Sequence, residues 1–280
     1  MLIVRAPLRI SIGGGGTDIP SYYENNGGTV FSSLAIDKYI YVLLNDRFSK
    51  EIFLRYSENE LIDDHRHIKH PIIRETIKNL NHNTESIEIT SVSDVPGGTG
   101  LGSSGTFGVA LQLALRHKFK MECSQEIVAR ESTNIEMNIL KRPIGLQDQY
   151  ISAYGGLTEF KVDAESNVKV KKYPLNEEIK KKIKENLLLF YVDSTRDSSK
   201  VLSEEKKLME SNHKGKYDDI VNLGKTMFKK LTSLDLENYG KIMHEYWLIK
   251  RSRQKNFTEV RLNRIYDYLI EKDLIFGGKI

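Results

Sequence analysis

The sequence predicts an α+β fold, because segments of strand character dominate up to Tyr173 and long helices follow. The first part contains short runs rich in Val, Ile and Tyr that alternate between apolar and polar positions, as half-buried strands do. After Pro174 the apolar residues take on helical spacing. The chain shows no internal repeat and no low-complexity tract, so we expect an ordinary globular protein.

The expected strands lie at residues 2–12, 28–34, 38–45, 51–56, 86–92, 157–162 and 168–173. The last two are close enough in sequence to form a hairpin. The apolar run Leu187–Val192 is predicted to be a buried strand, since it is far shorter than the roughly 20 residues of a membrane span.

Helical spacing occurs at 70–80 and again after residue 104 to about 119, where Phe107, Leu111 and Leu115 are expected to lie in the core. Ser124 is the expected N-cap of a helix that runs to about Leu140. Residues 141–147 are predicted to form a loop. His65, His67 and His70 lack the partners of a zinc site, so a solvated loop or helix start is favoured.

Composition limits the possible partners. The chain has 42 Lys and Arg against 38 Asp and Glu, a net charge of +4. This surplus predicts no nucleic-acid and no membrane partner, although it suits an anionic small-molecule substrate. Cys123 is the only cysteine and no secretory signal is visible, so we expect a reducing, cytoplasmic location.

A glycine-rich loop carries the strongest chemical signal. Four glycines in 97–102 follow an expected strand, and two serines then open a helix. Glycines let the backbone approach a phosphate closely, and a helix start offers free N–H groups. The loop lacks the lysine of a Walker motif. It does not match a dinucleotide fingerprint either, because Glu122, the acid near the required distance, follows an expected helix and not a second parallel strand. A turn that merely caps the helix is the alternative to phosphate binding.

The string P-G-G-T-G-L-G-S-S at 96–104 resembles the second motif of the galactokinase, homoserine kinase, mevalonate kinase and phosphomevalonate kinase (GHMP) superfamily. Residues 5–18, R-A-P-L-R-I-S followed by G-G-G-G-T-D, resemble its first motif. Asn134–Asn138 and then G-L-Q-D-Q at 145–149, before Y-G-G at 154–156, resemble its acid-bearing region. Three motifs occur in the expected order.

This resemblance implies a GHMP kinase fold, with an N-terminal lobe like ribosomal protein S5 domain 2 and a ferredoxin-like C-terminal lobe. The N-terminal domain is expected at 1–180 and the C-terminal domain at 181–280. The superfamily has a third glycine-rich motif after a strand like Gly278–Ile280, so the C-terminal domain is expected to be incomplete at its C-terminus.

The resemblance also implies ATP and Mg²⁺ as cofactors. The nucleotide would be bound by Pro96, Gly97, Gly98, Thr99, Gly100, Leu101, Gly102, Ser103 and Ser104. Ser104 and Glu136 would hold the metal ion, Asp148 would act on the acceptor hydroxyl, and Arg9 would stabilise charge beside it. From the residues alone, Glu136 could be a solvated acid, Asp148 an N-cap, and Glu131 a competing ligand.

The acceptor site is expected at Gly15, Gly16, Thr17, Asp18, Gly156 and Arg196. The Glu-His pair that galactokinases carry before Thr-Asp is absent, and residues 5–23 resemble the branch with D-glycero-D-manno-heptose 7-phosphate kinases and fucokinase domains. This implies phosphorylation of an anomeric hydroxyl of a sugar phosphate, for nucleotide-activated heptose in capsule or lipopolysaccharide synthesis. Arg196 would bind the existing phosphate. A silent sugar-binding regulator and an RNA-binding protein are the alternatives from other classes.

Overall fold

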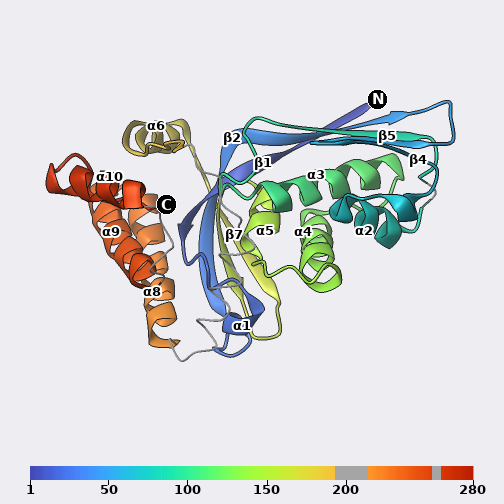
Figure 1. Cartoon of the computed structure of the whole chain (residues 1–280). Helices are drawn as coiled ribbons and strands as arrows, with labels where there is room; N and C mark the ends of the chain where they lie inside the picture. Colours follow the sequence, from blue (N-terminus) through green and yellow to red (C-terminus); the bar gives the residue numbers. More distant parts are fainter. Residues whose placement is uncertain (83, 193–213, 254–259, 280) are drawn as a thin grey trace. The chain divides into compact units, whose positions relative to one another are not determined.

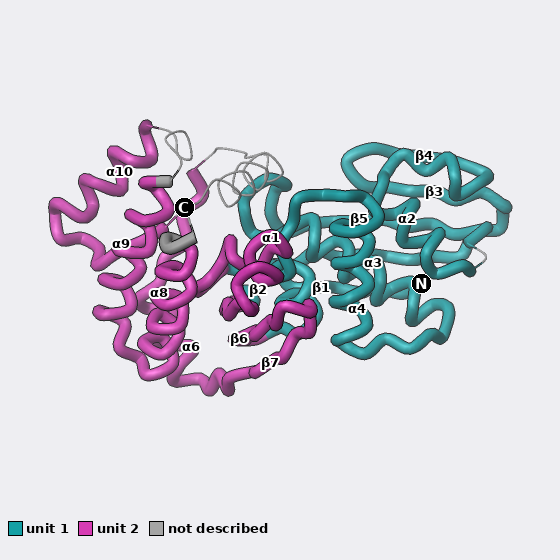
Figure 2. Tube along the Cα trace, turned by 90° about the horizontal axis from the view of Figure 1, so that it is seen from below, with its two compact units in different colours: residues 1–10, 35–155 teal, residues 11–34, 156–280 magenta. Residues whose placement is uncertain are grey.

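The computed structural model describes residues 1–82, 84–192, 214–253 and 260–279 (Figure 1). The chain forms two compact units that are interleaved in sequence (Figure 2). Unit 1 contains residues 1–10 and 35–155, and unit 2 contains residues 11–34 and 156–280. Strands β1 (Leu2–Gly13) and β2 (Thr29–Asp46) each contribute residues to both units. The domain division at residue 180 stays a prediction.

Unit 1 has a mixed sheet made by parts of β1 and β2 together with β3 (Ile52–Arg55), β4 (Asn59–Ile62) and β5 (Ile87–Ser93). β2 pairs antiparallel with β5, from Ile40 opposite Ser93 to Asp46 opposite Ile87. β3 runs parallel to β5, and β4 pairs antiparallel with β3. The short strand β4 was not predicted.

The two strands predicted at 28–34 and 38–45 are one continuous strand of 18 residues. The charged residues Asp37 and Lys38 lie where the two predicted segments meet. Both side chains are exposed, so the backbone passes through without interruption.

The helices of unit 1 are η1 (His65–His67), α2 (Pro71–Leu80), α3 (Ser103–Lys118), α4 (Gln125–Asn134), η2 (Ile135–Ile139) and α5 (Gln147–Tyr154). Ser124 caps α4 as predicted, because its side chain accepts a hydrogen bond from the backbone N–H of Ile127 at 3.4 Å. The predicted helix from Ser124 to Leu140 is correct in extent, but its last turn, η2, is π-helical. Glu136, one of the predicted metal ligands, lies in this turn.

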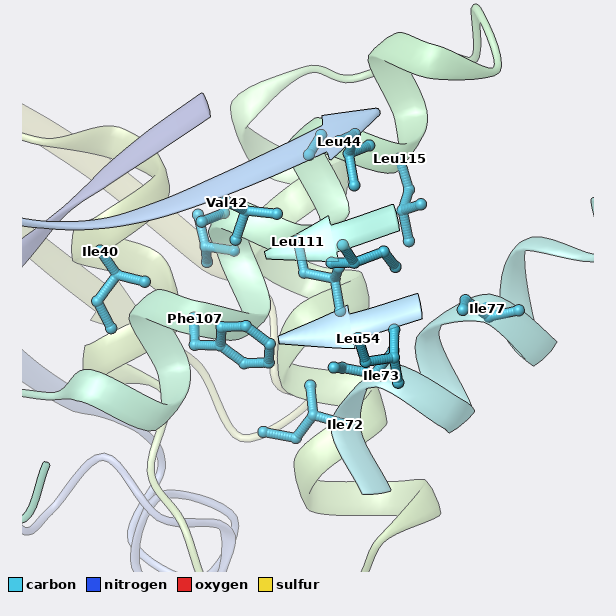
Figure 3. Close-up of a cluster of buried hydrophobic side chains, with 14 of the residues drawn as sticks. Ile40, Val42, Leu44, Leu54, Ile72, Ile73, Ile77, Phe107, Leu111 and Leu115 are labelled. Atoms are coloured by element: carbon cyan, nitrogen blue, oxygen red, sulfur yellow. The ribbon is translucent and has the colours of Figure 1, made fainter. Parts of the chain in front are cut away.

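The core of unit 1 lies between its strands and the helices that cover one face of them (Figures 1 and 3). Alternate residues of β2, namely Ile40, Val42 and Leu44, point into this core. Helix α3 contributes Phe107, Leu111 and Leu115, spaced four residues apart. Side chains of this kind each stabilise the fold by about 1.5–3 kcal/mol when fully buried. The predicted core positions of α3 are therefore confirmed.

Unit 2 contains α1 (Pro20–Tyr23), β6 (Leu157–Val162), β7 (Val168–Tyr173), α6 (Glu177–Asn186), α8 (Lys214–Thr232), α9 (Leu236–Arg253) and α10 (Val260–Glu271). The predicted hairpin is confirmed, with β6 and β7 paired antiparallel. β6 also pairs antiparallel with the first part of β2, from Thr29 opposite Val162 to Leu34 opposite Leu157. The predicted long helices after Pro174 are confirmed as well.

The prediction of a buried strand at Leu187–Val192 is wrong. The segment has no regular secondary structure, and Leu188 and Phe190 are 74% and 70% exposed. A strand needs a neighbouring strand for its backbone hydrogen bonds. Within the described residues the Val192 carbonyl accepts instead from the Arg261 side chain, Nη2, at 3.0 Å.

No helix in the described part of the chain is both long enough and apolar enough to cross a bilayer.

His70 immediately precedes α2 and caps it: its Nδ1 accepts a hydrogen bond from the Ile73 N–H at 3.4 Å. The rings of Tyr56 and Phe107 pack edge-on against it at 4.8 and 5.1 Å. Burial, and after it the charge of Arg142, hold the pKa of His70 below its ordinary value of 6.5. The cap therefore exists only while the imidazole is neutral.

We expect the stability of the protein to fall as the pH drops below about 6.5, because the unfolded chain then binds a proton that the folded imidazole resists. His70→Asn keeps a capping side chain and removes the titration. Urea unfolding between pH 7.5 and 5 should show a shallower loss for this variant than for the wild type. The exposed His82 gives the control, His82→Asn, and an equal pH dependence of wild type and His70→Asn would contradict the assignment.

Candidate active site

The glycine loop leads into the N-terminus of α3. Gly98, Gly100 and Gly102 have φ values of 77°, 74° and 82°, a region that other residues seldom adopt. Gly102 is the N-cap of α3 and no side-chain hydrogen bond caps the helix there. The first N–H groups of α3 have no acceptor within the helix, so this turn is suited to an anion.

Arg9 on β1 joins this loop to Asp148, which lies in the first turn of α5. Its Nε and Nη2 lie 2.7 and 2.5 Å from the same oxygen, Oδ1, of Asp148. Its Nη1 donates to the Gly100 carbonyl at 2.7 Å, and its backbone N–H donates to the Leu101 carbonyl at 3.1 Å. The two residues predicted to be catalytic are thus in direct contact, beside the predicted phosphate loop.

Ser104 and Glu136, the predicted metal ligands, are also in contact. The Ser104 hydroxyl donates to Glu136 Oε2 at 2.6 Å. Gln149 donates to the other oxygen, Oε1, at 2.8 Å, and Arg142 Nη1 lies 2.9 Å from Oε2. Glu136 is only 1% exposed, so it is not a solvated acid on a helix surface.

The competing assignments fit less well. Leu146, not Asp148, is the N-cap of α5. Asp148 is the second residue of the helix. Glu131 accepts from the Asn79 side chain at 3.2 Å and lies near Arg130. Its partners therefore differ from those of the Ser104 and Glu136 pair.

In unit 2 the glycine-rich turn at residues 13–18 is held by hydrogen bonds within the turn and by a contact with Thr29. The Thr17 hydroxyl donates to the Gly14 carbonyl at 2.7 Å and lies 2.6 Å from the Thr29 hydroxyl. The Gly16 N–H donates to Asp18 Oδ1 at 2.9 Å, and Asp18 is buried. These contacts fix the predicted acceptor residues Gly15, Gly16, Thr17 and Asp18 in one tight turn.

Two helices from the end of the chain brace this turn. The Tyr246 hydroxyl on α9 donates to the Gly15 carbonyl at 3.0 Å. A β-carbon at Gly13 would lie 2.5 Å from Gly224 Cα, so α8 and the loop can approach only because both positions are glycine. Gly156 immediately precedes β6. Arg196 lies outside the described residues.

The sequence analysis missed Arg142, Gln149 and Tyr246. Arg142 follows Glu136 by six positions in a stretch that was predicted only as a loop. Its position between the candidate acids Glu136 and Asp148 was the signal that could have identified it. Gln149 could have been found because it directly follows Asp148. Nothing in the local sequence connects Tyr246 to a loop 231 positions earlier.

Comparison with known proteins gives the class. Residues 69–156 match the family described as GHMP kinases N terminal domain. The chain is 25% identical over 290 residues to the D-glycero-alpha-D-manno-heptose 7-phosphate kinase of Campylobacter jejuni, in an alignment that covers 98% of this chain and 84% of that protein.

Two solved structures share the fold. A D-glycero-D-manno-heptose 1-phosphate kinase from Bacteroides thetaiotaomicron has a TM-score of 0.78 at 20% identity and covers 90% of this chain and 79% of its own. Streptococcus pneumoniae phosphomevalonate kinase in complex with phosphomevalonate and AMPPNP has a TM-score of 0.74 at 12% identity, over 95% and 85% of the two chains.

Residues 69–156 therefore match the GHMP kinase N-terminal domain, and the predicted GHMP kinase fold is confirmed. The prediction of an ATP-dependent phosphotransferase is confirmed at the level of this family. The roles of the individual site residues stay predictions.

Gly105 offers a test of how tightly α3 and α5 must pack. A β-carbon there would lie 2.7 Å from Asp148 Cβ and 3.1 Å from Gln149 Cδ. Gly105→Ala should cost about 1–3 kcal/mol in unfolding free energy through overpacking. It should also lower turnover by roughly 10²-fold if Asp148 moves by about 1 Å.

Gly108→Ala is the matched control on the same helix, since its nearest neighbours would lie 3.8 Å away. It should be neutral or stabilise by about 0.5–1 kcal/mol, as alanine does in a helix. Equal effects of the two substitutions on urea unfolding would contradict the close contact at Gly105.

Proposed function

We propose that the protein is an ATP-dependent sugar kinase that phosphorylates the anomeric hydroxyl of D-glycero-D-manno-heptose 7-phosphate, giving the 1,7-bisphosphate. The observation that carries this proposal is the contact of Arg9 with both Asp148 and the glycine loop. Such a pair places a carboxylate next to the expected phosphate position. The similarity along almost the whole chain to a heptose 7-phosphate kinase supports the choice of acceptor.

The glycine loop and the start of α3 would bind the ATP phosphates through backbone N–H groups. Ser104 and Glu136 fit a magnesium ion, because Mg²⁺ prefers oxygen ligands and the two oxygens lie 2.6 Å apart. When bound, the ion would neutralise charge on the phosphates. Arg9, which donates to the Gly100 carbonyl, would add a fixed positive charge beside the loop.

Asp148 would orient the acceptor hydroxyl and accept its proton as the phosphoryl group is transferred. Both contacting nitrogens of Arg9 bind Oδ1, so Oδ2 is the oxygen left to face the acceptor. The acceptor itself would be bound by the turn at Gly15–Asp18, by Gly156 and by Arg196. Thr17 and Asp18 hold this turn by hydrogen bonds to its own backbone.

The finer points of this proposal rest on similarity. The names of the two heptose kinase relatives differ in which phosphate the sugar already carries, so the phosphorylation position needs a direct test. Fucose and other sugars remain alternative acceptors. A cytoplasmic location and a role in capsule or lipopolysaccharide synthesis belong to the same proposal.

A coupled ADP-release assay tests the proposal with heptose 7-phosphate, heptose 1-phosphate, fucose, galactose and mannose as acceptors. Heptose 7-phosphate should give the highest kcat/KM. Asp148→Asn should lower kcat by roughly 10²–10⁴, the usual contribution of a positioned acid–base group, and leave ATP binding intact. Near-normal turnover of the variant would remove Asp148 from the mechanism, and a non-phosphorylated sugar as best acceptor would refute heptose 7-phosphate.

Arg196→Ala tests recognition of the existing phosphate. The variant should raise KM for heptose 7-phosphate by an amount worth about 1.5–3 kcal/mol, as expected for a charge-assisted hydrogen bond. KM for ATP and turnover of non-phosphorylated sugars should hardly change. Equal losses with phosphorylated and non-phosphorylated acceptors would mean that Arg196 has a structural role.

A further inference from the structure

Arg142 places a positive charge directly on the pair of residues that would bind magnesium. Its Nη1 lies 2.9 Å from Glu136 Oε2 and 3.1 Å from the Ser104 hydroxyl oxygen. Its backbone N–H donates to the Glu136 carbonyl at 2.9 Å, so the two residues are joined twice. One guanidinium nitrogen thus bonds to both oxygens that a metal ion would need.

The burial of Glu136 explains why a cation is required there. The side chain is 1% exposed, and a buried carboxylate costs free energy unless it is paired and hydrogen-bonded. Ser104 and Gln149 donate neutral hydrogen bonds to it, and Arg142 is the cation paired with it among the described residues. Arg142 itself is 31% exposed, so its side chain has a route to solvent.

We propose that Arg142 is a resident counter-ion for Glu136, which occupies the metal-binding pair while no metal–nucleotide complex is bound and must release both oxygens when the divalent ion arrives. This inference rests on the proposed function. Arg142 is a positioning residue: it balances the charge of Glu136 until a divalent ion binds. The nucleotide-free protein then binds divalent ions weakly, because each ion must displace the guanidinium.

Competition of this kind is reciprocal, so removal of Arg142 strengthens metal binding. Binding of Mn²⁺ to the nucleotide-free, full-length protein, followed by the electron paramagnetic resonance signal of free Mn²⁺, measures it without turnover. Arg142→Gln should bind Mn²⁺ about tenfold more tightly than the wild type, within the usual range of coupling. The double variant Arg142→Gln with Glu136→Gln should lose this gain.

Arg47→Gln is the matched control. Arg47 is 24% exposed and pairs with Glu51 at 3.5 Å in the same unit, away from the glycine loop. It should leave Mn²⁺ binding unchanged. Unchanged or weaker Mn²⁺ binding by Arg142→Gln, or a gain that survives Glu136→Gln, would overturn the proposal.

Thermal unfolding gives a second readout. In EDTA, Arg142→Gln should lower Tm by roughly 5–10 °C because the buried carboxylate loses its counter-ion, and Mn²⁺ should restore much of the loss. An unchanged Tm would overturn the proposal. Should Arg142→Gln not fold in EDTA, Arg142→Lys keeps a charge without the planar fork, and its Mn²⁺ affinity should exceed that of the wild type. An affinity equal to or below wild type would overturn the proposal.

Neither measurement uses a sugar acceptor. Failure of every sugar in the ADP-release assay would therefore defeat the proposed function alone. A protein that phosphorylates heptose 7-phosphate normally but shows no Mn²⁺ competition would defeat the role of Arg142 alone.

Discussion

The side chain of Arg9 is the contact on which the candidate active site depends. It extends from β1 and binds the glycine loop and the start of α5 at once. The pair is only partly exposed, at 15% and 31% for Arg9 and Asp148, so it is worth more than a surface ion pair. Because one guanidinium makes all these contacts, the distance between the glycine loop and the Asp148 carboxylate is set by a single rigid group.

A second constraint is the π-helical turn that ends the α4 helix. Regular α-helical winding places successive residues about 100° apart, and one wider turn shifts every side chain after it. Glu136 lies inside this turn and is buried against Ser104, whereas Glu131, in the regular part of α4, binds Asn79. Five positions apart, the two acids already point about 140° away from each other in regular α-helical winding, so they meet different neighbours although they look interchangeable in the sequence.

Much of the fold and of the candidate site follows from the sequence, because both depend on local pattern. The period of the apolar residues predicts α3 and the β6–β7 hairpin, and the glycine motif predicts the turn before α3. Arg9 and Asp148 were predicted as site residues from the resemblance of their motifs to a known superfamily, and the structure places them in contact. Arg142 could not be predicted, since its importance depends on where η2 directs Glu136. The strand prediction for Leu187–Val192 was wrong because six apolar residues do not reveal whether a partner strand exists.

The interleaving of the two units has a consequence for synthesis on the ribosome. The Gly13–Asp18 turn is made early, but the tyrosine that binds the Gly15 carbonyl comes 231 positions later. At roughly 5–20 residues per second, the nascent turn waits on the order of 10–50 s for that contact. During this interval Thr17 and Thr29, both buried in the finished protein, lack the α8 and α9 helices that later brace their loop. The Gly13–Asp18 turn is therefore among the last parts of the molecule to mature, although it is among the first to be translated.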